Sequence, residues 1–77
     1  LATIQTLIAA EYTRARRKFA TFNSAHEAYA VLLEEVDELW AEVKSNKLKA
    51  ARQEAVQVGA MALAFLLEVG NDAEHAI

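Results

Sequence analysis

Hydrophobic residues recur every three or four positions along most of this chain, which is the spacing that places them on one face of an α-helix. The first such stretch covers residues 3–19, with apolar positions at Ile4, Leu7, Ile8, Tyr12, Ala15 and Phe19. The periodicity stops at residues 20–23. Ser24 and Glu27 then match a capping box, in which both side chains bind free backbone N–H groups at the start of a helix. We therefore predict one helix over residues 3–19 and a second that begins at Ser24.

The second helix carries the strongest periodic signal. Its apolar side chains fall within an arc of roughly 120°, at about 100° per residue. They are Tyr29, Leu32, Leu33, Val36, Leu39, Trp40 and Val43. A polar break at residues 45–47 has the length that joins antiparallel neighbours, and a third helix is predicted from residue 48 to 69, closed by Gly70 and Asn71. The last two helices should form a hairpin, and residues 72–77 should fray or begin a further helix.

The third predicted helix is apolar on every side between residues 55 and 67, except at Gln57. A helix of this kind must be covered all round, and two partner helices from one chain cannot do so. We therefore expect a single all-α domain over residues 1–77, built as a helical hairpin plus an N-terminal helix. Association into a homodimer or homotetramer would complete a four-helix-type bundle around a shared core.

Composition narrows the functional classes. The chain has 77 residues, is 55% hydrophobic and contains no Pro and two Gly, which fits helices better than disorder or a turn-rich β fold. It has no Cys, so disulfides, thiolate metal sites and a Cys nucleophile are excluded. A net charge of −3 argues against a nucleic-acid binder. The longest apolar run, residues 58–67, is about half of the ~20 residues that a membrane span needs, so we expect a cytoplasmic protein.

Carboxylates gather beside the apolar arc of the second helix. Glu35, Glu38 and Glu42 follow three- and four-residue spacing, so they share one face. The third helix offers Glu54 and Gln57, also three residues apart. Because Glu38 and Glu54 lie at similar distances from the break at 45–47, the hairpin should bring them to the same height. Oxygen ligands arranged in this way select Mg²⁺ or Mn²⁺ rather than Zn²⁺.

Two of these segments resemble known motifs. EEVDE at residues 34–38 and EAVQ at residues 54–57 are similar to the E-E-x-x-E and E-x-x-D motifs of the MazG-like all-α nucleoside triphosphate pyrophosphohydrolases. The resemblance spans residues 24–69. It implies a homo-oligomeric helical bundle that cleaves a nucleoside triphosphate into the monophosphate and pyrophosphate with Mg²⁺. It also implies a water activated by the metal as the nucleophile, with no catalytic side chain.

The same resemblance implies roles for individual residues. Glu35, Glu38 and Glu54 would be metal ligands, and Glu34 would support the site or touch a second ion. The family has Asp where this chain has Gln57, whose carbonyl can coordinate Mg²⁺ but brings no negative charge. Two alternatives therefore stay open. One is a non-catalytic module that binds a nucleotide or another helical protein, and the other is a purely structural oligomerisation domain.

Several further residues allow two readings. His26 is a candidate for binding the base or sugar of a substrate, although a lone exposed His is the plainer interpretation. The basic run at residues 14–18 can reach phosphates or simply face solvent. Phe19 and Phe22 can stack on a base or pack in the core, and Trp40 is expected in the core or in an interface. We expect Glu42 to be a solvent carboxylate paired with a nearby Lys.

Overall fold

The computed structural model describes residues 1–70 and contains three α-helices in that part of the chain, with no strand. These are α1 (Ala2–Lys18), α2 (Ala25–Lys44) and α3 (Leu48–Glu68). The all-α prediction is confirmed, and both α1 and α3 end one residue before their predicted ends. The expectation for residues 72–77, and the closing Asn71, lie outside the described residues.

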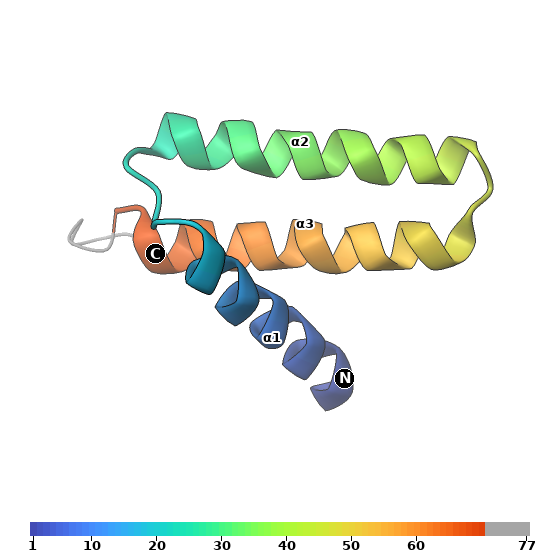
Figure 1. The fold of residues 1–77 in the computed structure, drawn as a ribbon, viewed down its shortest axis with the longest axis horizontal. Helices are drawn as coiled ribbons and strands as arrows, with labels where there is room; N and C mark the ends of the chain where they lie inside the picture. The colour runs from blue at the N-terminus through green and yellow to red at the C-terminus, as the bar shows by residue number, and fades with distance from the viewer. Residues whose placement is uncertain (71–77) are drawn as a thin grey trace.

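The three helices form a hairpin with one branch. Helices α2 and α3 lie antiparallel and side by side. The C-terminal end of α1 lies against the C-terminal end of α3, and toward its N-terminus α1 diverges from the hairpin (Figure 1). Among the described helices, α3 packs against both others, but α1 and α2 do not pack against each other. Helix α3 is thus the central element, and within residues 1–70 it is the one helix that packs against α2.

The helix ends explain where the chain turns. The Ser24 hydroxyl accepts a hydrogen bond from the Glu27 N–H at 3.1 Å, as the capping box predicts. The Glu27 carboxylate instead accepts from the Asn23 N–H at 2.6 Å, one residue earlier than the expected partner. Between α2 and α3, Asn46 adopts a left-handed φ of 56°, a conformation that Asn tolerates better than most residues. A tight reversal and an antiparallel hairpin follow.

Small residues make up most of the core. The residues that are more than nine-tenths buried within the described chain are Ala15, Ala28, Ala51, Ala60, Met61 and Ala64. Helix α1 approaches α3 so closely that a Cβ at Gly59 would lie 3.0 Å from Ile8 Cδ1. The small residues of α3 therefore allow close helix packing, and none of the large side chains described is fully buried.

The apolar arc of α2 divides into two parts. Leu32 and Leu39 are half-buried, whereas the other five positions are exposed. Trp40 is 57% exposed, so it does not belong to the core of the chain itself. The reason is geometric, because one neighbouring helix cannot cover an arc this wide. Separately, no helix within residues 1–70 combines the length and apolarity that crossing a membrane requires.

Candidate metal centre

Three carboxylates converge near the middle of the hairpin. Glu35 and Glu38 lie one turn apart on α2, and Glu54 reaches them from α3. Each offers an oxygen, and these oxygens all lie within 4.8 Å of one another. Glu35 and Glu54 are half-buried and Glu38 is exposed. The structure therefore brings together the three residues that the two acidic segments single out, at the height expected from their distance to the turn.

The electrostatics of this acidic cluster are unfavourable without a cation. Burial and the neighbouring carboxylates of Glu38 and Glu54 raise the pKa of Glu35 from its ordinary 4.5 to about 7. Burial, followed by Glu38, also raises the pKa of Glu54. Within the described chain, Glu54 Oε2 is buried and has no hydrogen-bond partner. A buried carboxylate oxygen without a donor is costly unless a proton or a cation compensates.

Glu42 extends this cluster rather than facing solvent. The side chain is half-buried, and its charge contributes to the raised pKa of Glu54. In the part of the chain that the structure describes, Glu42 forms no ion pair with Lys. The expected Lys pairing is therefore not found, because Glu42 lies on the side of α2 that turns toward α3.

A groove of about 470 Å³ opens beside the acidic cluster. Its walls come from the end of α1, the linker between α1 and α2, the first half of α2 and the middle of α3. Its polar lining includes Glu34, Glu35 and Gln57, and we call the part formed by the two Glu residues its acidic side. Apolar lining comes from Phe19, Phe22, Val31 and Met61. Glu35 is thus shared between the acidic cluster and the groove, which combines an apolar interior with a charged edge.

The remaining candidate residues lie in different places. Gln57 lines the groove, and after the larger effect of Arg14 it helps to lower the pKa of Glu11 of α1. Arg14 forms an ion pair with Glu11 and also lines the groove. His26 is exposed and does not line this groove. The structure therefore places Gln57 and Arg14 beside the site and leaves His26 away from it.

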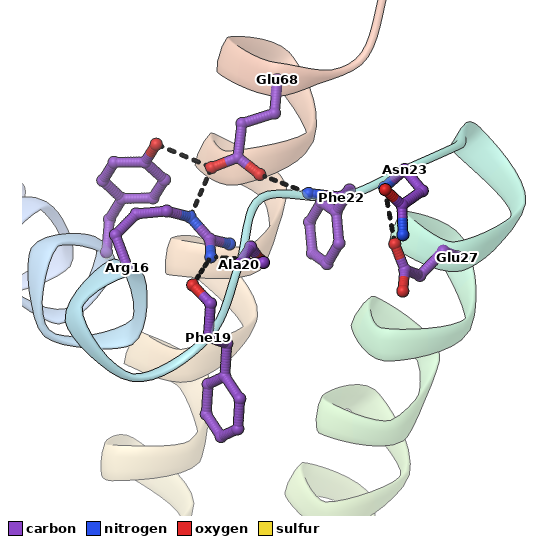
Figure 2. Close-up of polar contacts among 8 residues, drawn as sticks. Arg16, Phe19, Ala20, Phe22, Asn23, Glu27 and Glu68 are labelled. Atoms are coloured by element: carbon purple, nitrogen blue, oxygen red, sulfur yellow. Dashed lines mark hydrogen bonds and ion pairs between the residues drawn. The ribbon is translucent and has the colours of Figure 1, made fainter.

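A second carboxylate site, which the sequence did not reveal, holds the linker in place (Figure 2). Glu68 accepts hydrogen bonds from Tyr12 Oη at 2.7 Å, Arg16 Nε at 2.6 Å and the Phe22 N–H at 3.1 Å. Burial disfavours the charged form of Glu68, but these hydrogen bonds outweigh that effect and lower its pKa. Glu68 therefore ties together α1, the linker and the end of α3.

Arg16 also binds the linker backbone. Its Nη1 donates to the carbonyl oxygens of Phe19 and Ala20, both at 2.7 Å, and its guanidinium lies 5.5 Å from the ring centre of Phe22. We call the network formed by Glu68, Tyr12, Arg16 and Phe22 the Glu68 clasp. Arg16 is thus committed to the fold rather than to solvent or a phosphate. A sequence signal that could have indicated this site is that Glu68 is the one acidic residue between positions 55 and 69. The clasp fixes the linker wall of the groove.

No family model, curated protein or solved structure gave a significant match to this chain. Function must then be inferred from the chemistry of the site rather than from the fold. That chemistry consists of three clustered carboxylates, one of them with a buried and unpartnered oxygen, next to a groove with an apolar interior.

Proposed function

We propose that this protein is a Mg²⁺- or Mn²⁺-dependent nucleoside triphosphate pyrophosphohydrolase that acts in the cytoplasm as a homo-oligomer. It would release a nucleoside monophosphate and pyrophosphate. The observation that carries the proposal is the convergence of Glu35, Glu38 and Glu54 beside a groove. The resemblance of residues 34–38 and 54–57 to the motifs of the MazG-like family supports the same assignment.

The residues present fit a hard divalent cation. Glu35, Glu38 and Glu54 would hold it, since carboxylate oxygens are the ligands that Mg²⁺ prefers and waters and phosphates complete its shell. Glu54 Oε2, buried and unpartnered within residues 1–70, would gain the positive neighbour that it lacks. Glu34, exposed on the same turn of α2, would add charge at the edge of the site. A bound cation would therefore offset the burial and the carboxylate repulsion that together raise the pKa of Glu35.

The adjacent groove suits a nucleoside. A volume of about 470 Å³ lies within the range of roughly 300–1,000 Å³ typical of small-molecule pockets. Phe19, Phe22 and Val31 offer apolar and aromatic surface for a base, and Arg14 offers a cation for a phosphate. Since Glu35 lies on the acidic side of the groove, a base held inside would direct its triphosphate toward the cluster.

The reaction needs no nucleophilic side chain. When bound, the cation neutralises phosphate charge and acidifies a water. The water oxygen would form a bond to the α-phosphorus and release its proton to solvent, while the bond to the α–β bridging oxygen breaks and that oxygen leaves with pyrophosphate. The role of Glu35, Glu38 and Glu54 is to position the cation, and that of Arg14 is to hold phosphate charge during the transfer.

The test is direct. Purified protein is incubated with nucleoside and deoxynucleoside triphosphates plus Mg²⁺ or Mn²⁺, and released pyrophosphate is measured. Glu38→Gln should abolish release, because it removes a ligand charge at an exposed position that the fold does not need. Circular dichroism checks that this variant keeps its helices. The absence of pyrophosphate from every nucleotide would overturn the catalytic proposal.

One observation favours a second candidate function. Gln57 stands where the resembled family has Asp, so the second candidate is a non-catalytic module that binds a nucleotide or another helical protein. Calorimetry separates the two functions, because nucleotide binding without pyrophosphate release, converted to release by Gln57→Asp, would establish the second. A purely structural oligomerisation domain predicts neither nucleotide binding nor any effect of Mn²⁺ on the melting temperature.

A further inference from the structure

We propose that the preferred substrate carries a second nucleoside on its leaving group, so that it is a dinucleotide whose two nucleosides are joined through their phosphates. The observation behind this proposal is a second cavity, called the α1–α3 cleft, which meets the groove of about 470 Å³ beside the acidic cluster. The proposal rests on the proposed function, because it names the substrate class of the same site.

The α1–α3 cleft occupies the angle between α1 and the first half of α3, where α1 diverges from the hairpin (Figure 1). Arg14 and Gln57 line both the cleft and the groove. Of the acidic cluster, Glu54 lines the cleft and Glu35 lines the groove. The cluster therefore lies between two cavities, and a ligand whose phosphates reach it has room on both sides.

The cleft is larger than a pyrophosphate leaving group requires. Its volume is about 780 Å³, against a range of roughly 300–1,000 Å³ for pockets that hold drug-sized molecules. A pyrophosphate is far smaller than such a molecule and is strongly hydrated. The volume on the leaving-group side thus fits a substrate in which an organic group follows the phosphates.

One wall of the cleft is apolar. This apolar wall consists of Ile4 and Leu7, one turn apart on α1, and Val56 of α3. Ile4 is 42% exposed and Leu7 48% exposed, so much of this surface lacks cover within residues 1–70. A phosphate would lose water at such a surface without gaining a donor. A nucleoside, whose base has two apolar faces, would instead remove the wall from water.

Two cations of α3 line the same cleft. Lys49 and Arg52 are one turn apart and exposed, and neither forms an ion pair within the described chain. Arg14, the third cation of the lining, is paired with Glu11. Ammonium and guanidinium groups suit phosphate oxygens. Lys49 and Arg52 would thus hold the phosphates beyond the cleaved bond, and the second nucleoside would contact the apolar wall.

The cleaved bond is the same as in a triphosphate. The water oxygen bonds to the α-phosphorus and its proton goes to solvent, while the α–β bridging oxygen leaves with the phosphate of the second nucleoside. A dinucleoside diphosphate therefore gives two nucleoside monophosphates. Water is the one co-reactant, and nothing is oxidised or reduced.

The first test compares matched substrates. The protein is incubated with Mg²⁺ or Mn²⁺ and either the symmetric dinucleoside diphosphates of the four common ribonucleosides or the corresponding triphosphates, and nucleoside monophosphate is measured by chromatography. For the best base, kcat/KM should be about tenfold higher for the dinucleotide, because apolar contacts discriminate to this extent. Cleavage of triphosphates without cleavage of dinucleotides would overturn this proposal and leave the proposed function standing. No cleavage of either class would overturn both.

Leu7→Asp tests the apolar wall. It should lower kcat/KM for the dinucleotide about tenfold and leave that for the triphosphate unchanged, since only the dinucleotide reaches the wall. Ala9→Asp is the matched control, because Ala9 is exposed on the same helix and lines neither cavity. Ile4→Asp replaces Leu7→Asp if circular dichroism shows that the latter loses helicity. Equal losses on both substrates, or no loss on either, contradict the proposal.

Calorimetry gives a readout that is independent of turnover. The probe is a dinucleotide with a methylene group in place of the α–β bridging oxygen, which cannot be hydrolysed there. Lys49→Ala and Arg52→Ala should each weaken its binding several-fold, whereas Lys47→Ala, an exposed residue that lines neither cavity, should not. Sedimentation of Leu7→Asp completes the test. A lower mass than that of the unaltered protein, with unchanged dinucleotide binding, would assign the wall to a contact between copies and overturn the proposal.

Discussion

Two carboxylates of α3, about four turns apart, have opposite environments. Glu68 has a side chain only 6% exposed and accepts hydrogen bonds from a hydroxyl, a guanidinium and a backbone N–H. Glu54 faces two other carboxylates, and its buried Oε2 accepts nothing from the described residues. The pKa of Glu68 is lowered, whereas that of Glu54 is raised.

This contrast indicates that Glu68 serves the fold, whereas Glu54, on the same helix, is suited to bind a ligand. Glu68 is surrounded by donors, so its charge is satisfied by the fold and stabilises it. Glu54 is surrounded by like charges, so the fold alone gains nothing from it. Proteins retain unfavourable charge clusters mainly where a ligand compensates them. We therefore expect substitutions at the two residues to have opposite effects on stability.

Glu68→Ala should have the largest effect. It leaves the half-buried Arg16 without its counter-charge and removes the acceptor for Tyr12 and Phe22, so the free energy of unfolding should fall by about 3 kcal/mol. Urea denaturation measures this change. Glu68→Gln keeps one acceptor oxygen and should lose less. Glu34→Ala, the same truncation at an exposed site, should stay within about 0.5 kcal/mol. Equal losses of unfolding free energy in Glu68→Ala and Glu34→Ala would show that the clasp does not stabilise the fold.

Metal binding should stabilise the protein through Glu54, the other carboxylate of α3. At 100 times its dissociation constant, Mn²⁺ should raise the free energy of unfolding by about 2.7 kcal/mol, since it binds the folded state alone. Melting temperature with and without Mn²⁺ reports the gain. Glu54→Gln should lose most of it, whereas Glu68→Gln should keep it despite a lower starting stability. If both variants respond to Mn²⁺ equally, the acidic cluster is not the binding site.

Part of this contrast could be predicted from the sequence. Regular helix geometry was enough to predict that the three carboxylates of the acidic cluster meet. It places Glu35 and Glu38 on one face of α2, and it sets Glu38 and Glu54 at equal distances from the turn. The Glu68 clasp depends on where α1 crosses α3 and on the path of the linker, which no local period encodes. Likewise, periodicity located the apolar arc of α2 but not its exposure, because exposure depends on how many helices pack around it.

Without metal, Glu54→Gln should stabilise the protein by about 0.5–1 kcal/mol. The substitution removes one like charge from the cluster and supplies N–H donors to Glu35 and Glu38. Urea denaturation in a chelating buffer measures the change. Its sign is the sharper observation, because substitution of a half-buried polar residue usually destabilises. A loss of stability comparable to that of Glu68→Gln would mean that both carboxylates serve the fold.

An effect of similar size is a pH dependence of stability that differs between the two sites. Because the pKa of Glu35 is raised from 4.5 to about 7, the folded state binds more protons than the unfolded chain in this interval, and stability should fall as pH rises through it. Solvent screening at this half-buried group limits the effect to about 1 kcal/mol. The lowered pKa of Glu68 acts oppositely, since its contribution is lost as pH falls below 4.5.

Melting curves between pH 4 and 8 test both effects together. Glu35→Gln should flatten the decline between pH 4.5 and 7 and leave the acid limb unchanged, while Glu68→Gln should reduce the acid limb alone. Mn²⁺ should also reverse the decline near neutral pH, because a cation holds Glu35 ionised. Because the pKa of Glu54 is raised as well, a full decline that persists in Glu35→Gln and also in Glu54→Gln would assign it to groups outside the acidic cluster.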